Sequence, residues 1–183
     1  SNFVGIDFSQ DGIKKILENI RSSQLKNILV VFGDVREKLP HLFRAEELNS
    51  VYINLPDPWP KKRHFKRRLI KPELVKLISQ KLAPNGCAHL ATESESYAME
   101  MLEYFKVESS MQNVNHETGI SYLRKNLPKT KYEKSFLYAG DKIHYLEYSK
   151  VIDGEAHPNK EETGVSERER PLNNDEYLTR KFQ

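Results

Sequence analysis

Four acidic side chains come at or just after the end of short apolar stretches that are typical of β-strands: Asp7, Asp34, Asp57 and Glu93. In open α/β sheets, ligands bind beyond the carboxyl ends of the strands. A carboxylate at that edge can accept hydrogen bonds from ribose hydroxyls. Asp7 and Asp34 can equally be helix caps or turn residues, and the sequence leaves both interpretations open.

Asp57 lies between Pro56 and Pro58 and is followed closely by Trp59, the only tryptophan of the chain. Three prolines within residues 56–60 exclude a helix or a central strand there, so we expect a stiff loop. A rigid loop can hold a side chain in place for chemistry. Trp59 either stacks on a base or covers the core.

A concentrated basic segment follows Asp57. Residues 57–72 hold seven lysines and arginines against one acid, a net charge of +6, while the whole chain is only +3 and the remainder is therefore −3. Such focusing of positive charge suits a polyanion such as RNA or DNA. The alternative is that the segment is a solvated basic helix start without a nucleic-acid partner. His64, within this segment, either contacts a phosphate together with its neighbours or is solvated.

Composition narrows the class of protein. The chain has 183 residues and one cysteine, so it can form neither an internal disulfide nor a cysteine-based zinc cluster, and no metal site is predicted. Its longest apolar runs, such as residues 28–32, are far shorter than the roughly 20 residues that a membrane span needs. The first seven residues do not resemble a signal peptide. We expect a soluble cytoplasmic protein, monomeric or homodimeric, without a membrane partner.

Hydrophobic periodicity predicts alternating strands and helices as far as residue 105. We expect strands over residues 2–7, 27–32, 50–55 and 87–91, and helices over 9–20, 72–82 and 94–105, with a short helical or irregular crossover over 35–48. This order is typical of a doubly wound α/β sheet. Beyond it we expect a strand within 106–114, a polar connection over 119–127 and a hairpin formed by 134–138 and 143–148. The charged tail, 151–183, is expected to be flexible, which makes 1–150 the domain.

The thirteen residues from Pro56 to Arg68 resemble the signature of the bacterial tRNA (guanine-N7) methyltransferases, the TrmB family. Residues 3–7, 91–98 and 130–133 agree with the same family in the same order, so the resemblance covers about residues 2–149. It implies a class I, Rossmann-like methyltransferase fold, S-adenosylmethionine as methyl donor, and tRNA as substrate, with the variable-loop guanine at position 46 as the target.

The resemblance also implies residue roles. Asp7 would bind the donor's ribose, Asp34 would lie beside its adenine, and Asp57 would be the catalytic or donor-side acid. The implied substrate and RNA contacts are Lys61, Arg63, His64, Arg67, Arg68, Glu93, Thr130, Lys131, Tyr132 and Glu133.

Two departures from the family pattern affect these expectations. Glu93 stands where the family usually has an aspartate, and the Gly-rich strand-turn that normally precedes residue 2 is absent. We therefore expect two strands to lack the partner between them, and this chain to be part of the working enzyme and to bind S-adenosylmethionine poorly. The alternative is a non-catalytic RNA-binding remnant or subunit.

Overall fold

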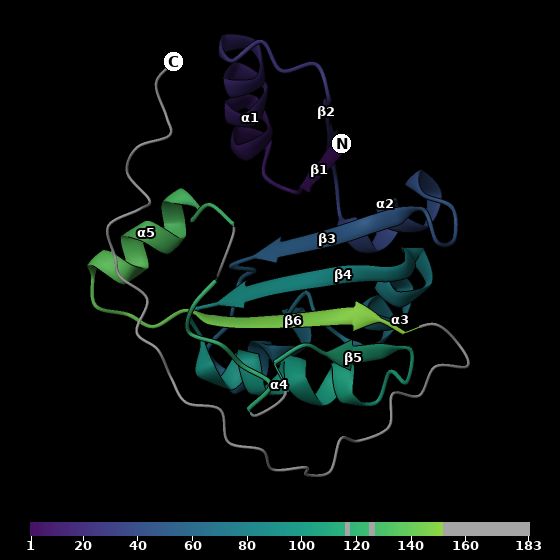
Figure 1. Cartoon of the computed structure of the whole chain (residues 1–183). Helices are drawn as coiled ribbons and strands as arrows, with labels where there is room; N and C mark the ends of the chain where they lie inside the picture. The colour runs from purple at the N-terminus through teal and green to yellow at the C-terminus, as the bar shows by residue number, and fades with distance from the viewer. Residues whose placement is uncertain (116–117, 125–126, 152–183) are drawn as a thin grey trace, which may run out of the picture.

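The computed structural model describes residues 1–115, 118–124 and 127–151 (Figure 1). Strands and helices alternate along most of this length, which confirms the α/β class. The elements in chain order are β1 (Phe3–Asp7), α1 (Gln10–Ser22), β2 (Ile28–Phe32), α2 (Val35–Leu42), β3 (Leu48–Asn54), the 3-10 helix η1 (Lys62–Arg67), α3 (Pro72–Lys81), β4 (Leu82–Thr92), α4 (Glu95–Lys106), β5 (Met111–Asn113), α5 (Lys131–Tyr138) and β6 (His144–Lys150).

The strands form two sheets. β1 and β2 pair in parallel, and a second sheet has the order β3-β4-β6-β5, in which β3 and β4 are parallel and β6 is antiparallel to both of its neighbours. Within the described residues β1 pairs only with β2 and β3 only with β4. Each therefore presents one backbone edge that is unpaired among those residues.

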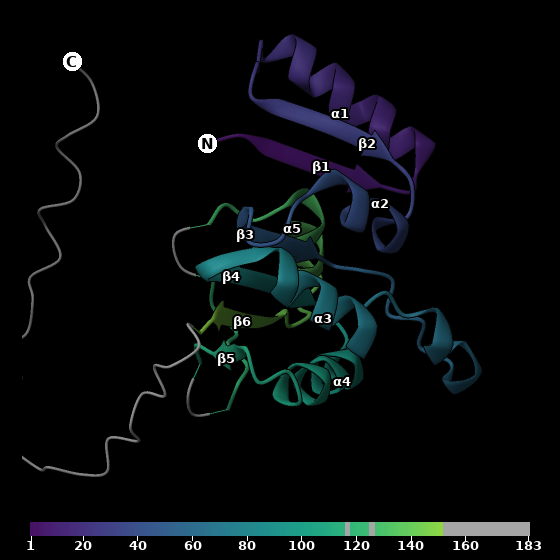
Figure 2. The same ribbon diagram turned by 90° about the vertical axis from the view of Figure 1, so that its right-hand side faces the viewer.

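The core lies between the four-stranded sheet and helices α3 and α4, which pack on the same side of it (Figure 2). The apolar faces predicted for these helices are largely confirmed. Ile78 of α3 and Met101 and Phe105 of α4 are almost completely buried, and Phe105 stacks on Tyr148 of β6 with 4.2 Å between ring centroids. The best-buried part of the molecule thus lies directly beneath the strands that lead to the candidate site.

The N-terminal segment has the predicted elements but a thinner core. Ser9 caps α1, its side chain accepting a hydrogen bond from the Gly12 N–H. The apolar residues of α1 have helical spacing, yet none of them is fully buried, and Leu17 is 43% exposed. β1 and β2 leave Phe3 and Leu29 more than half exposed.

β4 begins earlier than predicted. Asn85 and Gly86, which precede the predicted start at residue 87, form an irregularity inside the strand, where the register between β3 and β4 shifts. A side chain at Gly86 would lie 2.8 Å from the Ala83 carbonyl oxygen and 3.0 Å from that of Leu48. Glycine therefore serves here to let the backbones of β3 and β4 approach, not to end an element.

The predicted hairpin is wrong. Residues 134–138 belong to α5, and β6 pairs with β4 and β5. Thr130 and Glu133 form a reciprocal capping box that begins α5, and this local signal outweighs the β-propensity of the aromatic residues that follow. The strand expected within 106–114 is limited to β5, because α4 continues to Lys106 and a turn occupies residues 107–110.

Residues 152–183, almost the whole of the predicted tail, lie outside the described residues. Among the helices that the structure describes, none combines the length and apolarity needed to cross a bilayer.

Replacing Phe105 with alanine should lower the free energy of unfolding by about 3–5 kcal/mol, because it leaves a cavity between α4 and β6. Val107→Ala is the matched control: Val107 follows α4 directly but is 76% exposed, so its truncation should cost less than about 0.5 kcal/mol. Urea denaturation monitored by circular dichroism measures both. Equal losses for the two variants would contradict the assignment of the core.

Candidate active site and nucleic-acid interface

The loop from Leu55 to Pro60 leaves the carboxyl end of β3 in a strained conformation. The Leu55 N–H donates to the Ala91 carbonyl of β4 at 2.8 Å. Leu55 and Trp59 both have positive φ angles, 51° and 43°, which cost non-glycine residues about 1–3 kcal/mol each. The loop therefore keeps its shape because its surroundings impose it. The carboxylate of Asp57, between the two strained residues, is exposed and has no hydrogen-bond or ion-pair partner among the described residues.

Trp59 packs against the basic segment. Its ring makes an edge contact with His64 at 5.7 Å between centroids, and the Arg67 guanidinium lies over it at 4.9 Å. Base stacking and core packing were the two interpretations of Trp59 from the sequence. The structure adds a third role, because the ring packs against His64 and the Arg67 guanidinium and so helps to position them.

Most of the basic side chains of this segment point to solvent. η1 and the residues around it lie between β3 and α3 and project to one side of the molecule (Figure 2). No acid of the described residues forms an ion pair with the exposed cations of this group, Lys61, Lys62, Arg63, Lys66 and Arg67. Arg63 is joined to His64 by a 3.3 Å hydrogen bond. Unpaired, closely spaced cations of this kind form an electrostatic surface for phosphates.

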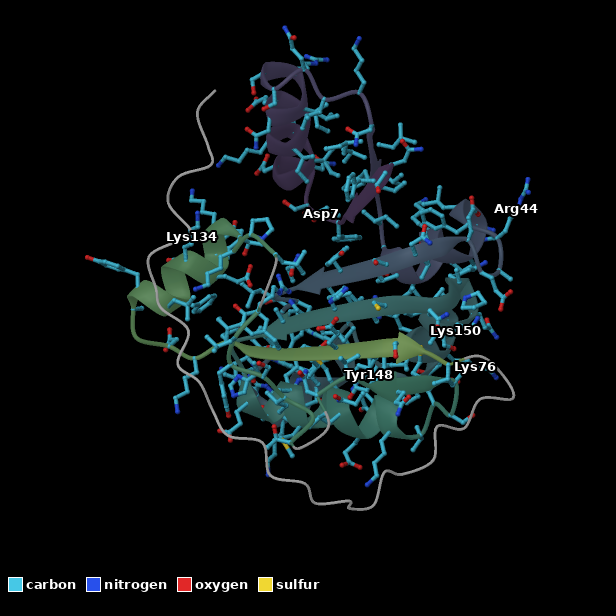
Figure 3. The ribbon with its side chains drawn as sticks, viewed as in Figure 1. Asp7, Arg44, Lys76, Lys134, Tyr148 and Lys150 are labelled. Carbon is cyan, nitrogen blue, oxygen red and sulfur yellow. The ribbon has the colours of Figure 1, made fainter. Side chains whose placement is uncertain are left out.

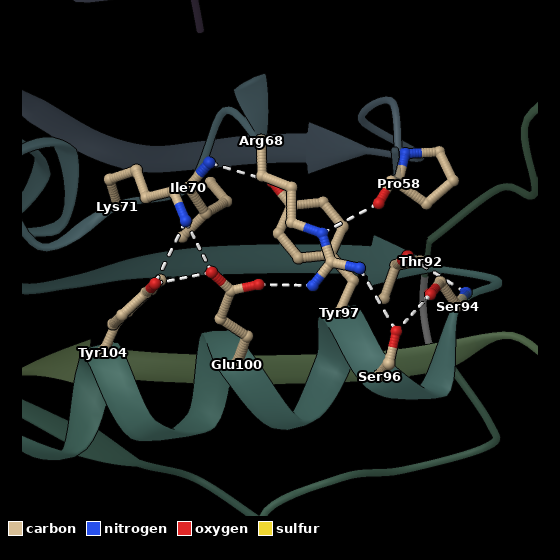
Figure 4. Close-up of polar contacts among 10 residues, drawn as sticks. All are labelled: Pro58, Arg68, Ile70, Lys71, Thr92, Ser94, Ser96, Tyr97, Glu100 and Tyr104. Carbon is tan, nitrogen blue, oxygen red and sulfur yellow. Dashed lines mark hydrogen bonds and ion pairs between the residues drawn. The ribbon is translucent and has the colours of Figure 1, made fainter. Parts of the chain in front are cut away.

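Arg68 differs from its neighbours because its side chain is only 1% exposed. Figure 4 shows its guanidinium between the Asp57 loop and α4. Nε donates to the Pro58 carbonyl oxygen at 2.8 Å, one terminal nitrogen bonds Glu100, and the other donates to Ser96 Oγ at 3.2 Å. The resemblance implied an RNA contact for Arg68, but a guanidinium enclosed in this way leaves no surface for a phosphate.

Glu100 binds the two basic side chains of this segment that do not point to solvent, Arg68 and Lys71. It accepts hydrogen bonds from Arg68, Lys71 and Tyr104 (Figure 4). Burial by itself would raise the pKa of Glu100, but these hydrogen bonds, with Lys71 the strongest contributor, outweigh it and hold that pKa below its ordinary value of 4.5. The carboxylate therefore stays charged and ties the residues after η1 to α4.

The remaining strand-end acids have different environments. Asp7 Oδ1 accepts the Ser9 N–H at 2.8 Å, and Figure 3 shows the residue where β1 leads into α1. Asp34 caps α2 and also bonds Arg36, whose guanidinium lowers the pKa of Asp34. Both residues thus have the capping or turn role that was one of their interpretations. Glu93 follows β4, is half-buried, and has no hydrogen-bond partner among the described residues.

Thr130–Glu133, expected as a substrate loop, forms the start of α5. Glu133 is completely buried, and its Oε2 accepts the Thr130 N–H at 2.6 Å. Burial acts to raise the pKa of Glu133, but the hydrogen bonds from Thr130 prevail and lower it. Lys131 and Tyr132 on the same turn are exposed, Tyr132 by 70%. These four residues therefore divide into two that shape the turn and two that face solvent.

Sequence reasoning missed Arg124. Its Nη2 donates to Asn54 Oδ1 at 2.9 Å, its Nη1 lies 3.4 Å from Glu133 Oε1, and its guanidinium lies over the Tyr145 ring. Arg124 therefore connects the end of β3, three residues before Asp57, to the start of α5, which lies beside the carboxyl ends of β3 and β4 (Figure 1). Only its position as an arginine within a largely uncharged connection distinguished it in the sequence.

A cavity of about 320 Å³ opens beside Arg124 on the sheet face away from α3 and α4. Its lining includes Tyr52, His89, Tyr145 and Glu147. His89 stacks on Tyr52 with 4.7 Å between ring centroids, and its Nδ1 lies 3.5 Å from Glu147. Burial lowers the pKa of His89, which favours a neutral imidazole.

The amino-acid sequence is similar to those of known proteins. A family model described as "Putative methyltransferase" matches residues 1–146. A tRNA (guanine-N(7)-)-methyltransferase of Alkalilimnicola ehrlichii is 36% identical over 149 residues, which are 81% of this chain and 62% of that protein. Its counterpart in Cupriavidus metallidurans is 38% identical over 140 residues, 76% of this chain and 53% of that protein. The chain therefore spans less than two thirds of these relatives.

Solved structures share the fold at low sequence identity. An rRNA methylase of Streptococcus thermophilus superposes with a TM-score of 0.55 at 14% identity, over 82% of this chain and 74% of that one. A Streptococcus mutans protein solved in complex with SAH has a TM-score of 0.51 at 10% identity, over 82% and 76% of the two chains. At these identities the similarities show that the chain shares the fold of these proteins.

Glu100→Gln should remove an acid-sensitive part of the stability. Because the folded-state pKa of Glu100 is lowered, its contribution is present above the unfolded-state value of 4.5 and is lost as pH falls through the folded-state pKa. The gap in unfolding free energy between the unsubstituted protein and the variant should therefore shrink between about pH 7 and about pH 3. Urea titrations at the two pH values measure it, with Glu103→Gln, an exposed acid of α4, as control. A gap that does not change with pH would contradict the role of Glu100.

Proposed function

The chain belongs to the methyltransferase family whose model matches residues 1–146, and we propose that the protein transfers a methyl group from S-adenosylmethionine to N7 of a guanine in tRNA. One observation carries the proposal: the unpaired Asp57 carboxylate lies on a strained loop directly before a group of exposed, unpaired cations. A catalytic acid and an RNA-binding surface are thereby joined in one continuous segment.

The positive charge of the segment after Asp57 and the names of the curated relatives support tRNA as the substrate. The curated relatives carry the name tRNA (guanine-N(7)-)-methyltransferase, and the exposed cations Lys61, Arg63 and Arg67 with the neighbouring His64 supply contacts for an RNA backbone. Within tRNA we propose the variable-loop guanine at position 46, as the resemblance of the signature implies. Residues 1–150 would form the catalytic domain, working in the cytoplasm.

Guanine N7 has a free lone pair, so the reaction needs no general base. It needs instead a fixed position for the base and negative charge near a guanine that becomes cationic. Asp57 and Glu93, whose carboxylates are unpaired among the described residues, suit this role and can accept hydrogen bonds from the N1–H and N2–H₂ edge. Such contacts discriminate against adenine by about 1–3 kcal/mol each.

Thr130 and Glu133 would act by shaping the substrate side. Their capping box fixes the first turn of α5, and exposed Lys131 and Tyr132 on that turn can face the RNA. Glu133 supports this arrangement through Arg124, because the same guanidinium reaches Asn54 at the end of β3.

S-adenosylmethionine would supply an electrophilic methyl group. Asp7 fits a role on its ribose: Oδ1 accepts the Ser9 N–H, and Oδ2 lies beside Gly12 at the start of α1, 2.9 Å from where a Cβ would be. Asp34 would act at the adenine side through the turn that it stabilises with Arg36. Asp57 would contact the donor or the guanine from the loop that follows the carboxyl end of β3.

Asp57→Asn should reduce methyl incorporation into tRNA by about 10²-fold, because it removes the negative charge while keeping the shape of the side chain. Transfer of radiolabelled methyl groups measures this. Glu73→Gln, an exposed acid at the start of α3, is the control and should keep full activity. Incorporation by the Asp57 variant within a few-fold of the unsubstituted protein would overturn its role. Binding of tRNA without methylation by the unsubstituted protein would favour the non-catalytic RNA-binding alternative.

Replacing Arg63 and Arg67 together with glutamine should weaken tRNA binding and reduce the slope of log K against log salt by about 1.5 units. The matched control replaces Arg44 and Lys76, two exposed cations that Figure 3 shows toward the end of the sheet where β3 and β4 begin. Filter binding across a salt series measures both slopes. An unchanged slope for the Arg63/Arg67 variant, or an equal change for the control, would exclude this segment as the RNA surface.

A further inference from the structure

We propose that Arg68 is a positioning residue that couples the RNA-binding segment to the Asp57 loop. This inference rests on the proposed function for its catalytic consequence, but its structural content is independent of it. Arg68 comes directly after η1 in the chain, and its side chain reaches back to Pro58, the residue after Asp57. A single side chain thus connects the surface that meets RNA with the loop that carries the candidate acid.

The contacts of Arg68 join three parts of the molecule. Nε donates to the Pro58 carbonyl oxygen of the loop, Nη1 bonds Glu100 in the middle of α4, and Nη2 donates to Ser96 in its first turn (Figure 4). The planar guanidinium satisfies all three partners in a fixed geometry, which the single ammonium of a lysine cannot reproduce. The loop is therefore held against the best-packed helix of the domain.

Aromatic rings restrict the same guanidinium further. Its carbon lies 3.7 Å from the centroid of Phe65 in η1 and 4.7 Å from that of Tyr97 in α4. Tyr97 is fully buried, and its hydroxyl accepts the Ile70 N–H at 2.9 Å. Because Phe65 belongs to η1, a shift of η1 on binding RNA would act on Arg68 and, through it, on the Pro58 carbonyl.

The strain in the loop explains why such a contact is needed. Leu55 and Trp59 hold left-handed backbone conformations on either side of Asp57, and such conformations persist only where surrounding contacts impose them. Within the described residues, Arg68 is the side chain that hydrogen-bonds a backbone group between these two positions. Losing that bond should let the loop relax and move Asp57.

Lys71 provides the matched control, because it shares the Glu100 carboxylate with Arg68 and touches nothing in the loop. Its Nζ bonds Glu100 at 2.6 Å and the Tyr104 hydroxyl at 3.1 Å. Lys71→Met therefore removes a cation from the same cluster and tests whether weakening Glu100 alone is enough. Arg68→Lys keeps the charge but loses the hydrogen bond to Pro58.

Trp59 makes the test independent of catalysis, because it is the single tryptophan of the chain and lies one residue after Pro58. In the full chain, Arg68→Lys should raise the acrylamide quenching of Trp59 toward that of an unfolded chain and lower its anisotropy, while circular dichroism shows the fold retained. It should also lower kcat at saturating tRNA by about 10-fold or more, with the Kd for tRNA and its salt slope unchanged. Lys71→Met should leave the quenching and kcat as in the unsubstituted protein.

Equal effects of the two substitutions on quenching and kcat would overturn the proposal, because they would reduce Arg68 to a general stabilising residue. Trp59 quenching that does not change in Arg68→Lys would overturn it as well. If the unsubstituted protein transfers no methyl groups, the proposed function fails, while the quenching difference between the two variants still decides whether Arg68 holds the loop.

Discussion

The buried contact between Arg68 and Glu100 is the constraint on which the candidate site depends. Removing the Arg68 guanidinium from water carries a desolvation cost of several kcal/mol, which is recovered only when the geometry is good and its donors are satisfied; Glu100, whose side chain is 18% exposed, keeps part of its hydration. Here the donors are satisfied by Pro58 and Ser96, and the carboxylate is also bound by Lys71 and Tyr104. The pair thus anchors a proline-rich loop, which could not be fixed by a strand ladder, to the helix that covers the core.

This contact also separates the basic segment into exposed cations and one buried cation. Arg67 and Arg68 are adjacent and have the same chemistry, yet one lies over Trp59 at the surface and the other is enclosed by Phe65 and Tyr97. Net charge could indicate a surface suited to a polyanion, but not which of its cations lie at that surface. That distinction depends on Glu100, more than thirty residues later in the chain, and a contact at this separation leaves no local pattern.

The parts of the fold that follow from local rules were predictable. The Ser9 cap, the strand that ends at Asp7 and the helix that Pro72 begins are all where propensity and spacing indicate. The segment 134–138 was misassigned because aromatic residues outweighed a capping signal four residues earlier, and the early start of β4 was missed because its pairing with β3 depends on a close approach at Gly86. In the site, the position of Asp57 followed from its prolines, whereas Arg124 and the inward turn of Arg68 depend on tertiary contacts.

The acids near the carboxyl ends of the strands can be separated by how their charge is balanced. Asp34, Glu100 and Glu133 each have a neighbouring cation and accept at least one hydrogen bond, and in each the pKa is lowered. Their negative charge is already balanced within the fold. Asp57 precedes seven basic residues and forms an ion pair with none of those that the structure describes. Such separation is not expected of a flexible segment, because a carboxylate among so many cations would find a partner. It follows from the hydrogen bond of Arg68 to the next residue, Pro58, and from the packing of Arg67 on Trp59, which fix the loop and η1 relative to each other in an arrangement where Asp57 has no cation of the described residues as partner. The negative charge of Asp57 is thereby kept available for a ligand that brings positive charge to this edge of the sheet.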